Sequence, residues 1–489
     1  MSLATALILL PLGAALLVWL APLDRLAVVG VALAAVVAEI ALWITTLVRF
    51  DLDKGTLQFS DQASWFKDLG VSFHLGLYSY SLWLVGMSVI VMAAAIAYGA
   101  WAGRERPRAY FGLMLFLLAA VVAVFEAQDL LLFYVAWEAM LIPLYFLVGV
   151  WGGADRAAAT YKFVVYTIAG SLLMLASIIV YGLQQGTFDM TLTKDSGSLW
   201  LFLGFAAAFA IKAPLFPFHG WLPQAYREAP PEVAAVLSGV VSKTAAYGFL
   251  RLGVIEFGGP SQEVRNVVLA LATVGLVYGS VVAFRQPDLR GILAYSSLAQ
   301  MGLITMGIYA IDLGGLNGAV LQMVNHGLIS GVMFLLAGIV ERRAGSGDVA
   351  RLGGMARGRP VLATVLLVGG MIALAVPGSA TFAGEFLILT GVFSSGWGWT
   401  AVGAAAIVLA AMYALRLISA VLHVRKGEAV TDSARDLRLP ELAFVLPLLG
   451  CLIALSVWPN AITSHSFGKG TQQCVPLANV LTLAKEDCP

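Results

Sequence analysis

The sequence predicts an all-α polytopic membrane protein with about fourteen transmembrane helices. Of its 489 residues, 60% are hydrophobic and only 12% are charged, and the mean hydropathy is +0.89. Soluble domains carry about 25% charged residues, so this composition excludes an ordinary soluble fold. The apolar residues gather in runs of about 20, the length at which an α-helix crosses the bilayer core. The net charge of +1 gives no reason to expect a nucleic-acid partner.

Fourteen apolar runs follow one another along the chain and define the expected spans. They cover residues 3–22, 27–48, 80–102, 110–127, 129–151, 161–183, 199–218, 231–252, 264–284, 291–309, 314–340, 361–393, 399–423 and 441–459. The run 361–393 is too long for one straight crossing and contains "ALAVPGSATFAGEF", which predicts a broken helix. The first run has no basic leader and no cleavage site, so we expect it to remain as a span.

The loops between the spans carry basic residues unequally, and this sets the expected orientation. Loops after odd-numbered spans hold 18 of the 29 lysines and arginines, the opposite side holds 8, and three lie within spans. Cytoplasmic loops are the basic ones, so both termini are predicted to be extracytoplasmic. In the longest outer loop, 49–79, alternating apolar residues predict a small hairpin. Cys474 and Cys488 lie in the outer tail, either as a disulfide or as two free thiols.

Five ionisable side chains inside the spans form a candidate hydrophilic axis, joined by the polar Gln300. They are Glu138 in "LLFYVAWEAMLIPLYF", Lys212 in "FAIKAPLFPFHGWLP", Lys243 in "LSGVVSKTAAYGFL", His326 in "LQMVNHGLISG" and Glu385 in "TFAGEFLIL". A charge at the centre of a span costs about 2.5–3.5 kcal/mol on insertion scales, so such residues usually face protein or water and serve a function. Glu39 in the second span has no assigned role, and Glu126 is expected to be interfacial.

The chemistry of this axis fits proton movement better than capture of a substrate. Burial favours the neutral form of both a lysine and a carboxyl group, and pairing restores the charged forms. A Glu–Lys pair that opens and closes can therefore hold or release a proton, and a histidine titrates near neutral pH and suits a relay. The alternatives are a structural ion pair for Glu138 and a packed polar residue for His326.

Two interruptions accompany the charged residues. Pro214 and Pro217 follow Lys212, and Pro377 with Gly378 precedes Glu385. Proline removes a backbone donor and clashes with the preceding turn, so each pair should break its helix where protein or water can satisfy the freed groups. The seventh and twelfth spans cross in opposite directions, and paired broken helices of this kind are typical of inverted-repeat transport proteins.

These residues resemble the antiporter-like subunits of respiratory complex I and the related Mrp antiporters. The resemblance runs from about residue 80 to 460 and is specific in four blocks, which occur in order on the right spans. The blocks are "DLLLFYVAWEAMLIPLYFLVGVWGG", "FAIKAPLFPFHGWLPQAYREAPPEVAAVLSGVVSKTAAYGFLRL", "LRGILAYSSLAQMGL" and "QMVNHGLISGVMFLLAGIVERR". The resemblance implies fourteen helices with two inverted five-helix repeats, each with a broken helix. It divides the chain into residues 1–109 (three spans and the hairpin loop), 110–252 (first repeat), 253–424 (second repeat) and 425–489 (last span and tail).

The resemblance also implies roles for the axis residues. Glu138 matches the family's fifth-helix carboxylate, Lys212 its partner on the broken seventh helix, Lys243 the central lysine and His326 the relay histidine. Glu385 resembles the twelfth-helix residue of the chain M subgroup, equivalent to mitochondrial chain 4. Gln300 departs from the pattern "YSSxxHMG", which usually carries histidine there. Because glutamine cannot titrate, a proton that passes this position would need water or a neighbouring group.

The resemblance implies a proton-translocating membrane-arm subunit of NADH:quinone oxidoreductase in a bacterial cell membrane. No span has the cysteine spacing of an iron–sulfur cluster and no G-x-G-x-x-G turn joins a strand to a helix, so no catalytic, cofactor or metal site is expected here. NAD, FMN, iron–sulfur clusters and quinone are expected in partner subunits, and neighbouring membrane subunits, lipid and protons are the expected partners. The alternatives are a subunit of a Mrp-type cation/proton antiporter or of a membrane-bound hydrogenase, a stand-alone solute transporter and a scaffold.

Overall fold

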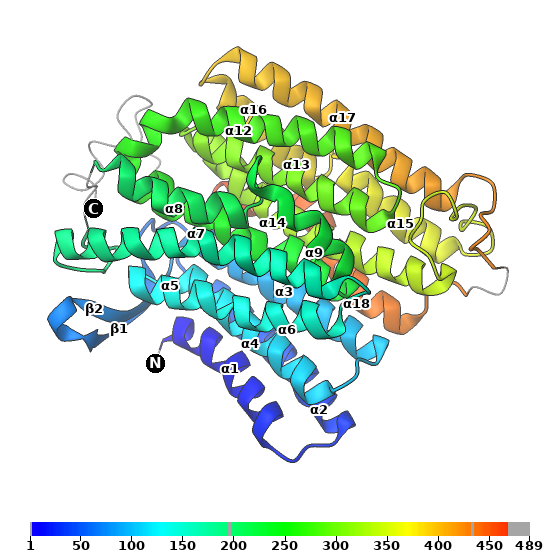
Figure 1. The fold of residues 1–489 in the computed structure, drawn as a ribbon, viewed down its shortest axis with the longest axis horizontal. Coiled ribbons are helices and arrows are strands. Elements are labelled where there is room, and N and C mark those ends of the chain that lie inside the picture. Colours follow the sequence, from blue (N-terminus) through cyan, green and yellow to red (C-terminus); the bar gives the residue numbers. More distant parts are fainter. Residues whose placement is uncertain (1, 194–196, 432–434, 468–489) are drawn as a thin grey trace.

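The helices of the chain lie nearly side by side in one bundle, as the computed structural model shows (Figure 1). The structure describes residues 2–193, 197–431 and 435–467, so Cys474 and Cys488 lie outside the described residues. Strands β1 (Gln58–Phe66) and β2 (Val71–Leu77) form an antiparallel hairpin at the end of the bundle where α1 begins. The predicted hairpin is therefore confirmed, and we call this side of the molecule the hairpin end.

Each of the fourteen predicted spans is helical in the described part of the chain. Ten are single helices: α1 (Leu3–Leu20), α2 (Arg25–Arg49), α3 (Ser79–Ala102), α4 (Pro107–Glu126), α7 (Arg156–Gln185), α12 (Gly258–Arg285), α13 (Leu289–Tyr309), α14 (Leu313–Ala344), α17 (Trp397–Leu422) and α18 (Leu439–Val457). Two are continuous but irregular: α5 (Leu130–Ala139) with α6 (Leu141–Trp151), and α10 (Pro231–Val236), η3 (Leu237–Val241), α11 (Ser242–Gly248) and η4 (Phe249–Glu256).

The remaining two spans are broken, as their prolines predict. The seventh consists of α8 (Leu199–Lys212) followed by the short η2 (Phe218–Trp221) and α9 (Leu222–Glu228). The twelfth consists of α15 (Pro360–Ala373) and α16 (Ala380–Phe393). Two short elements, η1 (Lys67–Leu69) in the hairpin turn and α19 (Asn460–Thr463), complete the described fold.

The centre of the bundle is formed by α14 and the irregular span 231–256, which are buried along the whole of their apolar stretches. In contrast, α1 and α2 expose many of their apolar side chains, among them Leu20 and Leu26 with about four-fifths of their surface accessible. In a membrane such a face meets lipid without penalty, so it needs no protein cover. A polar group on α14 is shielded from lipid, and this is where His326 lies.

Two isolated β-bridges repeat along the chain with the same spacing. Asp129 pairs with Asp189 and Asp288 pairs with Asp348, so the partners lie 60 residues apart in both cases. In each bridge the first aspartate caps the helix that follows it, α5 or α13, by accepting hydrogen bonds from backbone amides. The second aspartate accepts a hydrogen bond from the backbone amide two residues further along the chain. This equivalence favours a duplicated architecture, while the boundaries 110–252 and 253–424 remain predictions.

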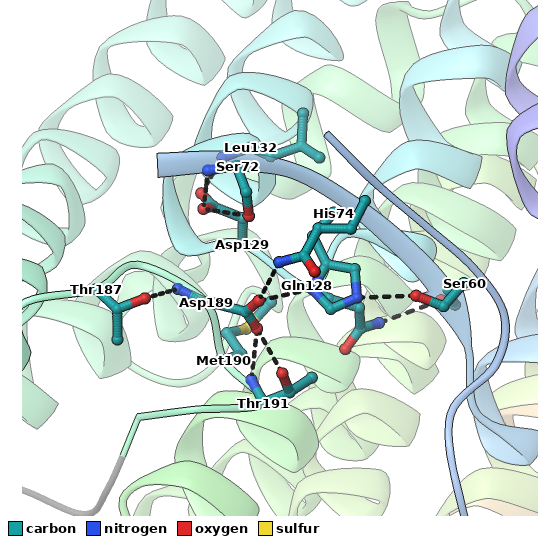
Figure 2. Close-up of polar contacts among 12 residues, drawn as sticks. Ser60, Ser72, His74, Gln128, Asp129, Leu132, Thr187, Asp189, Met190 and Thr191 are labelled. Carbon is teal, nitrogen blue, oxygen red and sulfur yellow. Dashed lines mark hydrogen bonds and ion pairs between the residues drawn. The ribbon is translucent and has the colours of Figure 1, made fainter. Parts of the chain in front are cut away.

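A buried polar cluster ties the hairpin to the helices (Figure 2). His74 on β2 contacts Asp189 through Nδ1 at 2.8 Å and Ser60 on β1 through Nε2 at 2.9 Å. The amide of Ser72 donates to Asp129 at the start of α5. Burial alone would raise the pKa of Asp189, but hydrogen bonds from His74 and Thr191 outweigh it and hold this pKa below its usual value.

The hairpin is also joined to the first helix. Asp61 on β1 accepts hydrogen bonds from the hydroxyl of Thr5 and from the amide of Ser2, the N-cap of α1. These bonds lower the pKa of Asp61 to about 2. Because a charged acceptor satisfies donors at the start of a helix, it stabilises both the helix end and the hairpin.

Ion pairs fasten the helices at the opposite end of the bundle. Arg104, in the α3–α4 connection, binds both oxygens of the buried Glu232 on α10, at 2.5 and 2.7 Å. Arg290 on α13 binds Glu341 on α14 in the same bidentate manner. Paired geometry of this kind is the strong form of the arginine–carboxylate contact. These arginines belong to the basic loops that the sequence predicts to be cytoplasmic.

Candidate functional site

The break in the seventh span follows directly from its prolines. Pro214 has no amide to give the carbonyl of Ala210, and the amide of Leu215 bonds to this carbonyl instead, at 2.8 Å. The carbonyl of Ile211, which loses its usual partner, accepts the indole N–H of Trp221 at 2.9 Å. The backbone groups at the break are thus satisfied by protein, and Lys212 is the last residue of α8.

Lys212 is buried against an aromatic ring. Its Nζ lies 3.7 Å from the centroid of the Trp137 ring and donates a hydrogen bond to the Trp137 carbonyl at 3.2 Å. An aromatic face attracts a cation by its quadrupole, and more strongly when water is excluded. Only 3% of Lys212 is accessible. The side chain therefore has a contact that stabilises its charged form without a counter-ion.

Glu138 is the charged residue that acts on Lys212 electrostatically, but the two are not in contact. No ion pair within 4.0 Å joins them in the described structure, in which the predicted pair is thus open. Glu138 is only partly buried and lies just before the interruption between α5 and α6 at Met140. Pro143 cannot donate to the carbonyl of Ala139, which explains this interruption.

Lys243 lies in a span that contains two π-helical segments, η3 and η4. Its Nζ donates to the carbonyl of Ser238 at 2.6 Å and to the hydroxyl of Ser242 at 3.2 Å. The third contact of Nζ is to Nδ1 of His326 on α14. π-Helical turns occur often at functional sites because the wider turn leaves backbone groups for other partners. Here the Ser238 carbonyl receives two such donors, from Ser242 and Lys243.

His326 continues the contacts of Lys243 into a group of three serines. Its Nε2 lies 3.3 Å from the hydroxyl of Ser330, one turn further along α14. Ser330 in turn contacts Ser238 at 3.0 Å, and Ser238 contacts Ser297 on α13 at 2.9 Å. Both imidazole nitrogens therefore have polar partners, so a proton on either one is hydrogen-bonded.

A second group surrounds Glu385 on α16. Gln300 on α13 donates from Nε2 to Glu385 Oε1 at 2.9 Å, and Gln322 on α14 donates to Gln300 Oε1 at 2.9 Å. Glu385 is 3% accessible, and its second oxygen has no hydrogen-bond partner. This unpartnered oxygen is the one that can carry a proton. Gln300 thus holds Glu385 rather than standing as an isolated exception to the family pattern.

A small cavity joins the two groups. It has a volume of about 30 Å³ and is lined by Gln300, Gln322, His326 and Ser330, among others. A water molecule needs about 10–15 Å³ of such space and two to four polar partners. The cavity meets both requirements, so the polar connection from Lys243 extends through His326 to the surroundings of Glu385.

The predicted axis residues are therefore connected unequally. Lys243, His326 and Glu385 belong to one nearly continuous polar chain, whereas no hydrogen bond or ion pair joins Lys212 to Lys243 in the described structure. Proton movement within the connected part needs only short transfers between neighbouring groups. The Lys212 region instead suits a change of charge that acts through space.

Sequence reasoning missed several members of this site. Gln322 and Ser330 lie four residues before and four residues after His326. This helical spacing predicts that the three side chains share one face of the helix. Ser238 carries no comparable signal, because its role depends on the π-helical turn.

The expectation for Glu126 is wrong. This residue is fully buried rather than interfacial, because α1, α2 and β2 pack against α4.

Comparison with known proteins identifies the family. Residues 127–414 match the model described as "NADH:quinone oxidoreductase/Mrp antiporter, TM". The chain belongs to this family. It is 36% identical over 456 residues to NADH-quinone oxidoreductase subunit M of Rhodobacter capsulatus, covering 88% of each chain. It is 34% identical over 503 residues to the protein of the same name in Mycobacterium tuberculosis, covering 92% of this chain and 90% of that one.

Solved structures share the fold over almost the whole chain. A chain of respiratory complex I from Thermus thermophilus with bound NADH matches with a TM-score of 0.87 and 28% identity, covering 95% of this chain and 97% of that one. A chain of the Mrp complex from Dietzia sp. matches with a TM-score of 0.85 at 22% identity, covering 95% and 96%. At that identity the second match supports the fold alone. The all-α polytopic membrane fold expected from the sequence is confirmed, and the two inverted five-helix repeats stay a prediction.

Proposed function

We propose that the chain is a proton-translocating membrane-arm subunit of an NADH:quinone oxidoreductase, of the subunit M type. The observation that carries the proposal is the buried polar chain from Lys243 through His326 and the cavity to Gln300 and Glu385. The subunit M relatives, at 32–36% identity, support the assignment to this complex rather than to a Mrp antiporter.

In this proposal the two parts of the axis have different tasks. A charge change in a neighbouring subunit acts on Glu138, which closes towards or moves away from Lys212. Trp137 holds the lysine in place while its charge varies. The altered field near Lys212 then favours release or uptake of a proton at Lys243, which shares a hydrogen bond with His326.

The proton leaves Lys243 by the connected groups. His326 accepts at Nδ1 and donates at Nε2, and water in the cavity that His326 and Gln300 both line carries the proton towards Glu385, the hydrogen-bond partner of Gln300. Gln300 cannot titrate, but it keeps the carboxyl group oriented. This order of transfers uses only this chain's residues and water.

Partners and location complete the proposal. NAD, FMN, iron–sulfur clusters and quinone belong to partner subunits, and lipid covers the apolar outer faces of α1 and α2. The chain lies in a bacterial inner membrane with both termini extracytoplasmic, so the hairpin end is the outer side. The excess of basic residues in the opposite loops supports this orientation.

Replacement of the charges at the first break tests the proposal. In the purified complex reconstituted into vesicles, Glu138→Gln and Lys212→Ala should each reduce NADH-driven proton translocation at least about tenfold, as expected when a group needed for proton transfer is lost. Lys67→Ala, in the exposed hairpin turn, is the control. Unchanged quinone reduction and proton translocation in both variants would contradict the proposal.

A further inference from the structure

Two buried carboxyl groups lie outside the proposed axis. Glu39 is in the middle of α2 and Glu126 is the last residue of α4, and neither has any accessible surface. All four of their oxygens lack a hydrogen-bond partner in the structure. The two side chains are close enough for their charges to interact, and α2 packs against α4. Nothing in the proposed mechanism requires either residue.

No cation in the described structure balances this pair. Helices α1, α3 and α6, which pack on α4, contain no charged residue. The ends of α2 carry Arg25 and Arg49, which are 14 and 10 residues from Glu39 and thus about 21 and 15 Å along the helix. The sequence of α4 provides only Arg108 near its far end.

The other neighbouring elements bring titratable groups that have partners of their own. Lys243 on α11 contacts His326 and Ser238, and His74 on β2 contacts Asp189. Glu138 on α5 acts on Lys212. Tyr247 on α11 also interacts with Glu126, and its hydroxyl donates to the Phe125 carbonyl at 3.1 Å.

Two negative charges in this position would be very costly. An unpaired carboxylate deep in the protein costs several kcal/mol even after relaxation, and two neighbouring carboxylates also repel each other. A bound metal cation would remove the repulsion, but hard cations need about six oxygen ligands. No group of three or more His, Cys, Asp or Glu residues able to hold a metal occurs in the described part of the chain. A proton needs only the carboxyl oxygens themselves.

We propose that Glu39 and Glu126 form a proton-binding carboxyl pair, which keeps at least one proton at neutral pH and lies beside the Lys243 helix but outside the central axis. Tyr247, one turn from Lys243 on the same span, interacts with Glu126 of this pair. The binding of this proton does not depend on the proposed function of the chain.

Infrared spectroscopy of the resting complex tests the pair without turnover. At pH 7 the Glu39→Gln/Glu126→Gln double variant should lose the carbonyl-stretch intensity of at least one protonated carboxyl group. The control Glu105→Gln, at an exposed position in the α3–α4 connection, should lose none. Because the measurement needs neither NADH nor proton translocation, its failure is distinct from failure of the proposed function.

Three outcomes overturn the inference. The first is an unchanged protonated-carboxyl signal in the double variant. The second is failure of this variant to assemble, because neutral amides of similar size should replace neutral carboxyl groups without loss. The third is a protonated-carboxyl signal that disappears when sodium chloride is added, which would show that a cation competes for the pair.

Discussion

The two broken helices place their charged residues on opposite sides of the break and in different surroundings. Lys212 ends the helix before its break and lies on the Trp137 ring, and no hydrogen bond or ion pair joins its Nζ to another side chain in the described part of the chain. Glu385 follows its break, six residues after the N-cap Ser379, and is held by an amide beside a water-sized cavity. The first region is suited to a change of charge and the second to the transfer of a proton.

The difference shows why a break alone does not define a proton site. In both spans the break frees backbone groups, and in both the protein satisfies them. Trp221 donates to the carbonyl of Ile211 in the seventh span. The hydroxyl of Thr381 donates to the carbonyl of Ile372 in the twelfth. The two regions differ in the side-chain donors, acceptors and free space that surround the ionisable group. Variants that change only these surroundings therefore test the difference between the two regions.

The largest effect is expected for Glu385→Gln. The amide retains the size of the side chain and the contact with Gln300, but it cannot bind and release a proton. We expect NADH-driven proton translocation in vesicles to fall about 10²-fold, the usual contribution of a positioned acid or base. Glu105→Gln is the matched control, and translocation at the wild-type rate in Glu385→Gln would remove this residue from the path.

A smaller effect is expected at Gln300. Gln300→Leu removes the contacts to both Glu385 and Gln322, so the carboxyl group loses its orientation and translocation should fall about tenfold, or ~1.4 kcal/mol. Gln300→His restores a donor and should retain most of the rate. Equal rates for the leucine and histidine variants would show that the contact with Glu385 is unimportant.

The aromatic contact of Lys212 is expected to matter still less. Trp137→Leu removes the ring but keeps the backbone carbonyl that accepts from Nζ. A cation–π contact contributes about 0.5–2 kcal/mol, so we expect translocation to fall about threefold or more. Trp137→Phe keeps an aromatic face, so its translocation rate should lie between those of the wild type and Trp137→Leu. A leucine variant as active as wild type would show that the ring does not hold the lysine during turnover.

The smallest effect is a pH dependence at the hairpin end. The pKa of Asp189 is lower in the folded protein than its usual value of about 3.9, so its ionised form stabilises the hairpin contacts above that pH. This stabilisation is lost as the pH falls through the lowered pKa. Hydrogen exchange of the β2 amides, corrected for the intrinsic pH effect, should show protection decreasing below about pH 4.

Asp189→Asn provides the comparison for this experiment. The variant should protect the β2 amides less at pH 7 and should lack the decrease that depends on Asp189. If it retains the wild-type pH profile, the contact between His74 and Asp189 does not stabilise the hairpin.

Much of the fold was readable from the sequence because lipid imposes a simple rule on helix length. Runs of about 20 apolar residues located the spans, and the prolines at 214, 217 and 377 located both breaks. The π-helical segments around Lys243 were not predictable. They depend on where Ser242 and the lysine place their donors after the span has packed against α14.

The sequence singled out the charged residues of the proposed site, but it could not indicate which of them are in contact. Lys243 and His326 stand out by charge and polarity, whereas their contact depends on the packing of two spans 83 residues apart. Glu126 was misjudged for the same reason: its position at a helix end suggested a surface, but the hairpin and α2 cover it. Burial at the end of a span is a property of the assembled bundle.

Proton translocation by a Lys243→Ala variant tests the connected axis most directly. The complex is reconstituted into vesicles, and the rates of NADH oxidation and of proton movement into the vesicles are recorded together. Lys67→Ala is the control. The account predicts that Lys243→Ala lowers proton translocation at least about tenfold while the control equals wild type. Translocation by Lys243→Ala at the wild-type rate per NADH oxidised would contradict the claim that protons pass through this chain by way of Lys243 and His326.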